Sequence, residues 1–192
     1  MQEEGSLHSV GGLTLRANFR WSLTGNVVNA ACQLGTLSVL AQLGTAESVG
    51  QFVLGSSIAA PILAVTMLQL RSVQATDAKG EYDFADYFAT RILSTILAFV
   101  VITTFAWVSH FDVKTTWVVI GIGAARCIES VSDIVRGLYQ RCERMDINGV
   151  SLMVQAVGGF VTVTVLMWWM QDLGLALGTM AIVWLGLFLA YD

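Results

Sequence analysis

Four charged residues, spaced so that one helix face would carry them all, are the strongest chemical signal in the chain. Arg126, Glu129, Asp133 and Arg136 follow one another at intervals of three, four and three residues inside an apolar stretch. In an α-helix this spacing covers one face over about 15 Å. A charge near the centre of a bilayer costs at least ~2.5–3.5 kcal/mol, so such residues face protein or water and commonly serve an ion or substrate path.

The pattern therefore predicts a transport face formed by Arg126, Glu129 and Asp133. The structural alternative is a self-neutralising ladder, Arg126 with Glu129 and Asp133 with Arg136, that only holds helices together. Arg136 stands near the end of the apolar stretch, where a long basic side chain can also extend to the membrane interface.

Polar side chains form stripes along two other apolar stretches. Asn26, Asn29 and Gln33 continue a run of three- and four-residue spacings that starts at Ser22, and Gln155 stands in a similar stripe further along the chain. Residues at these spacings share one face of a helix. Hydrogen bonds between helices are the structural alternative, at only ~0.6 kcal/mol per contact. Because exposure of amides to lipid is costly, whole stripes favour the wall of a water-filled cavity.

The composition indicates which elements must hold these residues. Of the 192 residues, 55% are hydrophobic and 12% are charged, whereas ordinary soluble domains carry ~25% charged residues. This balance argues against a soluble enzyme, and the net charge of -4 argues against a nucleic-acid partner. Apolar stretches long enough for spanning helices of ~20 residues cover residues 21–43, 50–70, 87–108, 117–135, 150–170 and 173–189.

The sequence thus predicts an all-α integral membrane protein with one six-helix transmembrane lobe over residues 21–192, preceded by a cytoplasmic N-terminal arm over residues 1–20. Lys and Arg favour cytoplasmic loops. Eight of the ten basic residues lie at or near the ends of stretches that would share the side of the N-terminus, whereas Lys114 lies on the other side. Both termini are therefore expected in the cytoplasm.

Two further features concern how the helices pack and move. The short connections at residues 44–49 and 171–172 predict that the first and second spans, and the fifth and sixth, are antiparallel neighbours. Pro61, the only proline, removes a backbone hydrogen bond inside the second span. It predicts a kink, which would act as a hinge or would only shape the packing.

Two segments of the chain resemble a known family. They are AAPILAVTMLQLRSVQATDAKGEYDFADYFATR, residues 59–91, and IESVSDIVRGLYQRCERMD, residues 128–146. Both resemble the Wzx-type oligosaccharide or O-antigen flippases of the polysaccharide biosynthesis transporter family, which belongs to the MOP superfamily, and the resemblance extends along essentially the whole chain. Arg71 and Asp77 match the first motif. The second motif is matched by Glu129, Asp133, Gly137, Gln140 and Arg141.

The resemblance implies a transporter rather than an enzyme, in the bacterial cytoplasmic membrane. Its substrate would be a polyprenyl-pyrophosphate-linked oligosaccharide for O-antigen, capsule or exopolysaccharide synthesis. The family fold has two pseudo-symmetric six-helix lobes around a cavity. The chain resembles the N-terminal lobe alone, so its expected partners are a second lobe or a homodimer partner, membrane lipids and the lipid-linked glycan. No cofactor is expected beyond coupling to H⁺ or Na⁺.

For such a transporter, we expect the charged residues of the spans to have separate roles. Arg91 and Arg126 are expected to attract pyrophosphate or acidic sugars, because guanidinium groups bind such oxygens bidentately. Glu129 and Asp133 are expected to take up the coupling ion. Three other functions stay open: a cation-coupled multidrug or small-solute antiporter, an integral membrane transferase, and an inactive half-transporter remnant.

Overall fold

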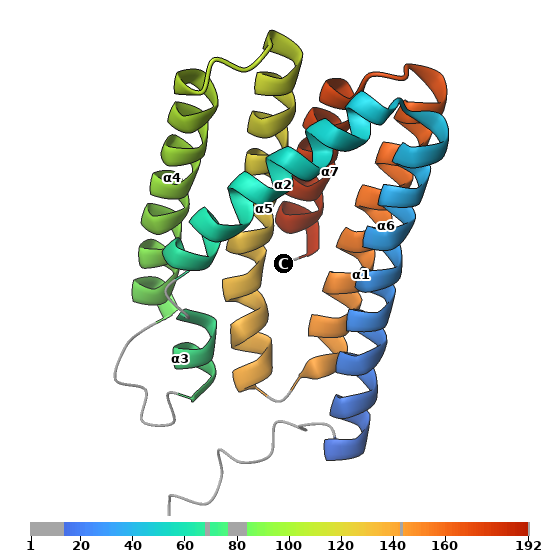
Figure 1. The fold of residues 1–192 in the computed structure, drawn as a ribbon. Helices are drawn as coiled ribbons and strands as arrows, with labels where there is room; N and C mark the ends of the chain where they lie inside the picture. The colour runs from blue at the N-terminus through green and yellow to red at the C-terminus, as the bar shows by residue number, and fades with distance from the viewer. Residues whose placement is uncertain (1–13, 68–69, 77–83, 143, 192) are drawn as a thin grey trace, which may run out of the picture.

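Helices account for all regular structure in the described part of the chain. The computed structural model describes residues 14–67, 70–76, 84–142 and 144–191, and no strand occurs within these ranges. Figure 1 shows six long helices running through the molecule and the short α3 at one end. The helices are α1 (Leu15–Leu43), α2 (Ala46–Thr66), α3 (Leu70–Thr76), α4 (Phe84–Val108), α5 (Val113–Arg141), α6 (Met145–Trp169) and α7 (Leu173–Tyr191).

Among the described helices, α2, α4, α6 and α7 are the four that are long and apolar enough to cross a membrane. α1 and α5 are longer, with 29 residues each. They carry the polar stripe and the charged residues, which lower their hydropathy. The predicted all-α membrane fold is thereby confirmed, whereas the count of six crossings stays a prediction.

Most helices extend beyond the limits expected from hydrophobicity, and α1 and α5 do so by the most residues. α1 begins at Leu15, where the Thr14 Oγ1 accepts a hydrogen bond from the Ala17 N–H at 3.4 Å. Residues 15–20 of the expected N-terminal arm are therefore helical, and residues 1–13 lie outside the described ranges. α5 continues to Arg141, past the predicted end at residue 135, because polar residues of its last turns find partners on neighbouring helices.

The central helix of the bundle is α5, which contacts α2, α3, α4, α6 and α7. α1 packs mainly along α6, and these two helices form one wall of the molecule (Figure 1). Their close approach depends on glycines. A Cβ on Gly25 would lie 3.2 Å from the Gly149 Cα, and a Cβ on Gly149 would lie 2.8 Å from the Trp21 carbonyl oxygen.

The prediction that α1 and α2 form an antiparallel pair is wrong. α2 crosses the bundle diagonally and packs against α5 and α4, with few contacts to α1 (Figure 1). The reason is the small-residue face of α2: Gly55 and Ala59 are buried, and a Cβ on Gly55 would lie 2.6 Å from the Ile122 Cδ1 of α5. The expected contact between α6 and α7 is present. α2 continues through Pro61 as one helix, and a hinge at this position stays a prediction.

Apolar side chains fill the interior and also cover much of the outside. Leu40, Ile102 and Leu177 are fully buried in the core between the helices. On the outer surface, Leu93 and Trp168 are 71% and 77% exposed. Large exposed apolar surfaces of this kind mark contact with lipid or with another protein.

Candidate functional site

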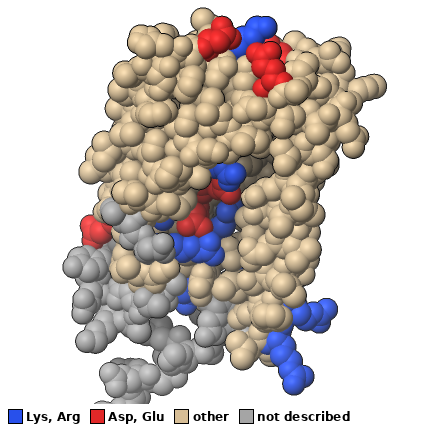
Figure 2. Space-filling model, in the orientation of Figure 1, with Lys and Arg blue, Asp and Glu red and all other residues tan. Residues whose placement is uncertain are grey.

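A cavity of about 550 Å³ lies between the α1–α6 wall and the central helix. Its lining comes from α1, α2, α5, α6 and α7 and is mostly apolar. We call it the central cavity. Figure 2 shows it as a recess with charged side chains inside an otherwise uncharged part of the surface. The polar side chains in its lining are Asn29, Gln33, Thr36, Ser56, Arg126 and Glu129.

An ion pair between Arg126 and Glu129 provides the charge of the central cavity. The Arg126 Nη1 lies 2.7 Å from the Glu129 Oε2, and the two side chains are 36% and 22% exposed. Their spacing of three residues on α5 places them on neighbouring turns. A guanidinium group has five N–H donors, and Glu129 engages one of its terminal nitrogens. Arg126 can therefore bind an anion while keeping or exchanging this partner.

Only part of the predicted path reaches this cavity. Asn29 and Gln33 of α1 line it together with Arg126 and Glu129, as the stripe and the charged face predicted. Asn26 instead donates its Nδ2 to the Ser22 carbonyl oxygen at 2.8 Å, within its own helix. The other predicted path residues, Arg91, Asp133 and Gln155, belong to two separate polar clusters outside the cavity lining.

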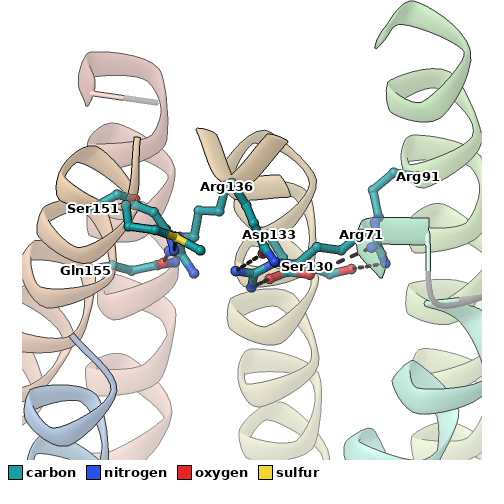
Figure 3. Close-up of polar contacts among 10 residues, drawn as sticks. Arg71, Arg91, Ser130, Asp133, Arg136, Ser151 and Gln155 are labelled. Carbon is teal, nitrogen blue, oxygen red and sulfur yellow. Dashed lines mark hydrogen bonds and ion pairs between the residues drawn. The ribbon is translucent and has the colours of Figure 1, made fainter. Parts of the chain in front are cut away.

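Asp133 is the centre of the first of these clusters. Its Oδ1 accepts a hydrogen bond from the Arg71 Nη1 at 2.5 Å, and its Oδ2 lies 3.8 Å from the Arg91 Nη2. Arg71 also donates to the Gln140 Oε1 at 3.3 Å, and Arg91 to the Ser130 Oγ at 3.4 Å. Figure 3 shows both arginines extending toward Asp133. This Asp133 cluster ties α3 and α4 to α5.

The Asp133 cluster contains a buried charge that needs compensation. Arg91 is 1% exposed, whereas the Arg71 and Asp133 side chains are 33% and 21% exposed. A buried charge is stable only when an opposite charge and hydrogen bonds replace its lost water. Arg91 therefore depends on Asp133 to compensate its buried charge, and it lies outside the lining of the central cavity.

Arg136 forms the second cluster and does not extend to the membrane interface. It is 3% exposed. Its Nε donates to the Ser151 Oγ of α6 at 3.2 Å, and its Nη2 donates to the Gln155 Oε1. The proposed ladder is therefore half right, since Arg126 pairs with Glu129, but Asp133 pairs with Arg71 and Arg91 instead of Arg136.

Trp184 is a cavity residue that the sequence reasoning missed. Its Nε1 donates to the Gln155 carbonyl oxygen at 2.9 Å, and its ring lies against Gly159, where a Cβ would be 2.7 Å from that nitrogen. Both Trp184 and Gly159 line the central cavity. Trp184 could have been suspected from the sequence, because it stands in the middle of a predicted span. Tryptophans that anchor a helix at the membrane interface stand near helix ends.

Two described motif positions, Gly137 and Arg141, belong to neither the central cavity nor the Asp133 cluster. Gly137 is buried on α5, and Arg141 is exposed at its end. Asp77 lies outside the described residues.

The comparisons with known proteins agree with this picture. The profile of a family described as polysaccharide biosynthesis protein matches residues 15–191, a range that includes every described helix. The chain belongs to this polysaccharide biosynthesis family. It is also 25% identical over 160 residues to the capsular polysaccharide biosynthesis protein CapF of Staphylococcus aureus. The aligned region covers 83% of the chain and 39% of the CapF length. No solved structure matches the chain.

Membership in the polysaccharide biosynthesis family confirms the resemblance carried by the two motif segments. It indicates a membrane protein with a role in polysaccharide biosynthesis. The structure adds a physical reason for the motifs: Arg71 of the first motif and Asp133 and Gln140 of the second meet in one cluster.

Proposed function

We propose that the chain is one lobe of a transporter that moves a polyprenyl-pyrophosphate-linked oligosaccharide across the bacterial cytoplasmic membrane, with both termini in the cytoplasm. The observation that supports this most is the Arg126–Glu129 ion pair in a cavity of about 550 Å³ inside an apolar helix bundle. A large polar head cannot cross the hydrocarbon core without such a lining. The family and the name of CapF support a glycan as the class of substrate.

Arg126 is the residue that we expect to meet the pyrophosphate. It lines the cavity and is 36% exposed, whereas Arg91 is 1% exposed and is held by Asp133 and Ser130. A guanidinium group binds phosphate oxygens bidentately. Before substrate binds, Glu129 neutralises Arg126.

Glu129 is correspondingly the preferred site for ion coupling. When pyrophosphate replaces it on Arg126, the released carboxylate takes up H⁺ or Na⁺. Asp133 is less suited to this role, because two guanidinium groups already hold its carboxylate. A second lobe, or a second copy of the chain, completes the enclosure of the cavity on its open side.

One observation favours a second candidate function, that of a cation-coupled multidrug or small-solute antiporter. Phe52, Phe160 and Trp184 line the cavity beside Arg126. Aromatic rings bind apolar and cationic drugs through their faces, although such rings are equally able to stack on sugar rings.

The test measures surface polysaccharide in the bacterium that carries the gene. The double variant Arg126→Ala, Glu129→Ala is compared with Arg20→Ala, which removes an exposed charge of α1 outside the cavity. We expect the double variant to lower surface polysaccharide about tenfold or more, because a hydrogen bond to a charged group is worth ~1.5–3 kcal/mol. Lipid-linked oligosaccharide should accumulate inside the cell, and Arg20→Ala should behave as wild type at equal protein level.

Two outcomes separate the hypotheses. Normal export by the double variant contradicts the assignment of the site. Normal export combined with lost resistance to cationic drugs supports the antiporter instead. The swapped variant Arg126→Glu, Glu129→Arg keeps an ion pair within α5 but moves the cation by about one turn. Normal export by this variant would mean that the pair serves only to stabilise the helix.

A further inference from the structure

A second cavity of about 680 Å³ lies at the end of the molecule where α2, α5 and α7 begin. We call it the end groove. It shares no lining residue with the central cavity, although α2, α5 and α7 contribute to both. Its volume falls within the ~300–1,000 Å³ range of sites that bind small molecules.

One part of the end groove is polar. Glu47, Lys114 and Asp172 bring two carboxylates and one ammonium group to its lining. Gln51 lies between elements, donating its Nε2 to the Glu47 Oε1 at 3.2 Å and to the Thr115 Oγ1 at 3.1 Å. Figure 2 shows red and blue side chains gathered at this end of the molecule, above a wide uncharged surface.

The other part of the end groove is formed by small residues. The lining includes two pairs of small residues, each three residues apart, which are Gly121 and Ala124 on α5 and Gly178 and Ala181 on α7. They begin nearly two helical turns from Lys114 and Asp172 of the polar part. A Cβ added to Gly178 would meet no atom within 4 Å. The groove is therefore open there and is not filled by the chain itself.

The surroundings of the end groove are apolar. Trp117 and Leu175, which line the groove, are 60% and 51% exposed. α2 and α7 are long and apolar enough to cross a membrane, so we expect the groove to adjoin lipid. A tryptophan at the boundary between polar and apolar surface is typical of the headgroup level of a bilayer.

We propose that the end groove binds one phospholipid, with its headgroup among Glu47, Lys114 and Asp172 and an acyl chain along the small-residue part. Because lipid tails are as apolar as a helix surface, the acyl chain gains mainly van der Waals packing against the groove wall. The ammonium group of Lys114 is a compact cation that attracts the lipid phosphate. Two carboxylates against one ammonium favour a headgroup that carries its own amine, so phosphatidylethanolamine should bind better than phosphatidylglycerol.

The structure offers a matched pair of substitutions to test this proposal. Gly178→Leu fills the groove, since its side chain meets open space. Gly186→Leu adds the same side chain to the same helix, again with no atom within 4 Å of the new Cβ, but outside the groove lining. Native mass spectrometry of the purified 192-residue chain, released from detergent micelles with added phosphatidylethanolamine or phosphatidylglycerol, counts the bound lipids.

We expect wild type and Gly186→Leu to bind one phosphatidylethanolamine molecule with equal affinity, and Gly178→Leu to bind it at least tenfold more weakly. Lys114→Gln should weaken binding of both lipids. Circular dichroism with equal helix content in both leucine variants excludes misfolding as the cause.

Equal phosphatidylethanolamine binding by Gly178→Leu and wild type would overturn the site. Tighter binding of phosphatidylglycerol would overturn the headgroup assignment. A dimer that Gly178→Leu dissociates, with lipid binding unchanged, would make the groove a helix-docking surface instead. These measurements do not depend on transport, so their outcome tests lipid binding independently of the proposed function.

Discussion

Replacing Asp133 by alanine removes the carboxylate that Arg71 and Arg91 share. The two arginines are affected very differently, because the Arg71 side chain is 33% exposed and Arg91 only 1%. Without Asp133, Arg71 can turn toward water and retain its hydrogen bond to Gln140. Arg91 stays buried with the Ser130 hydroxyl, 3.4 Å away, as its described side-chain partner.

The expected loss of stability follows from the different burial of the two arginines. Breaking a buried ion pair by removing one partner costs ~3–5 kcal/mol, because a charge is left buried without compensation. Since the Asp133 side chain is itself 21% exposed, we expect Asp133→Ala to lower the free energy of unfolding by about 3 kcal/mol. Arg71→Ala should cost about 1 kcal/mol or less, because a partly exposed pair is screened by water and Asp133 keeps Arg91.

The assay is unfolding of the detergent-solubilised chain by titration with sodium dodecyl sulfate, followed by tryptophan fluorescence. A double-mutant cycle with Arg91→Met isolates the cause. Methionine keeps the apolar stem of Arg91 without its charge, so in that background Asp133→Ala should cost only about 1 kcal/mol. The coupling between the two positions should therefore be about 2 kcal/mol.

Two results would refute this reasoning. Equal destabilisation by Asp133→Ala and Arg71→Ala would mean that the buried Arg91 is not what makes the loss of Asp133 costly. The same conclusion would follow if Asp133→Ala cost as much in the Arg91→Met background as it does in wild type.

The remaining predictions concern glycines at close helix contacts. Gly149→Ala should lower the free energy of unfolding by about 1–3 kcal/mol, because its Cβ would lie 2.8 Å from the Trp21 backbone oxygen and α1 must move away from α6; an unchanged unfolding midpoint would contradict this. Gly159→Ala should cost a similar amount, since Trp184 Nε1 would be 2.7 Å from the new Cβ, and cysteine cross-linking between α6 and α7 should report their separation. Gly186→Ala, which meets nothing within 4 Å, should be neutral or stabilise the helix by up to about 1 kcal/mol, and serves as their common control.

Much of the bundle could be predicted from local pattern. The stretches of apolar residues anticipated the long helices, because a chain in lipid must satisfy its backbone hydrogen bonds within each segment. Asn29 and Gln33 of the stripe on α1 line the same cavity as Arg126 and Glu129, and their role in a transport path stays a prediction. These inferences succeed because three- and four-residue spacing fixes which residues share a helix face.

The same spacing did not predict the partners of Asp133 and Arg136. They share a helix face with Glu129, but α5 has neighbours on several sides, and long side chains on one face turn to different helices. Arg71 reaches Asp133 across 62 residues of sequence, a distance over which periodicity carries no information.

By itself, then, the sequence determined a helical membrane protein, the helix face that holds each charge, and the motifs of its family. Those properties follow from backbone hydrogen bonding and helical periodicity, which are local. Only the tertiary structure decided that Arg126 and Glu129 line a cavity while Arg91 and Arg136 are buried outside its lining. That division depends on which helices surround α5, and the path of α2 across the bundle is set by close packing of small residues such as Gly55, which hydrophobicity does not encode.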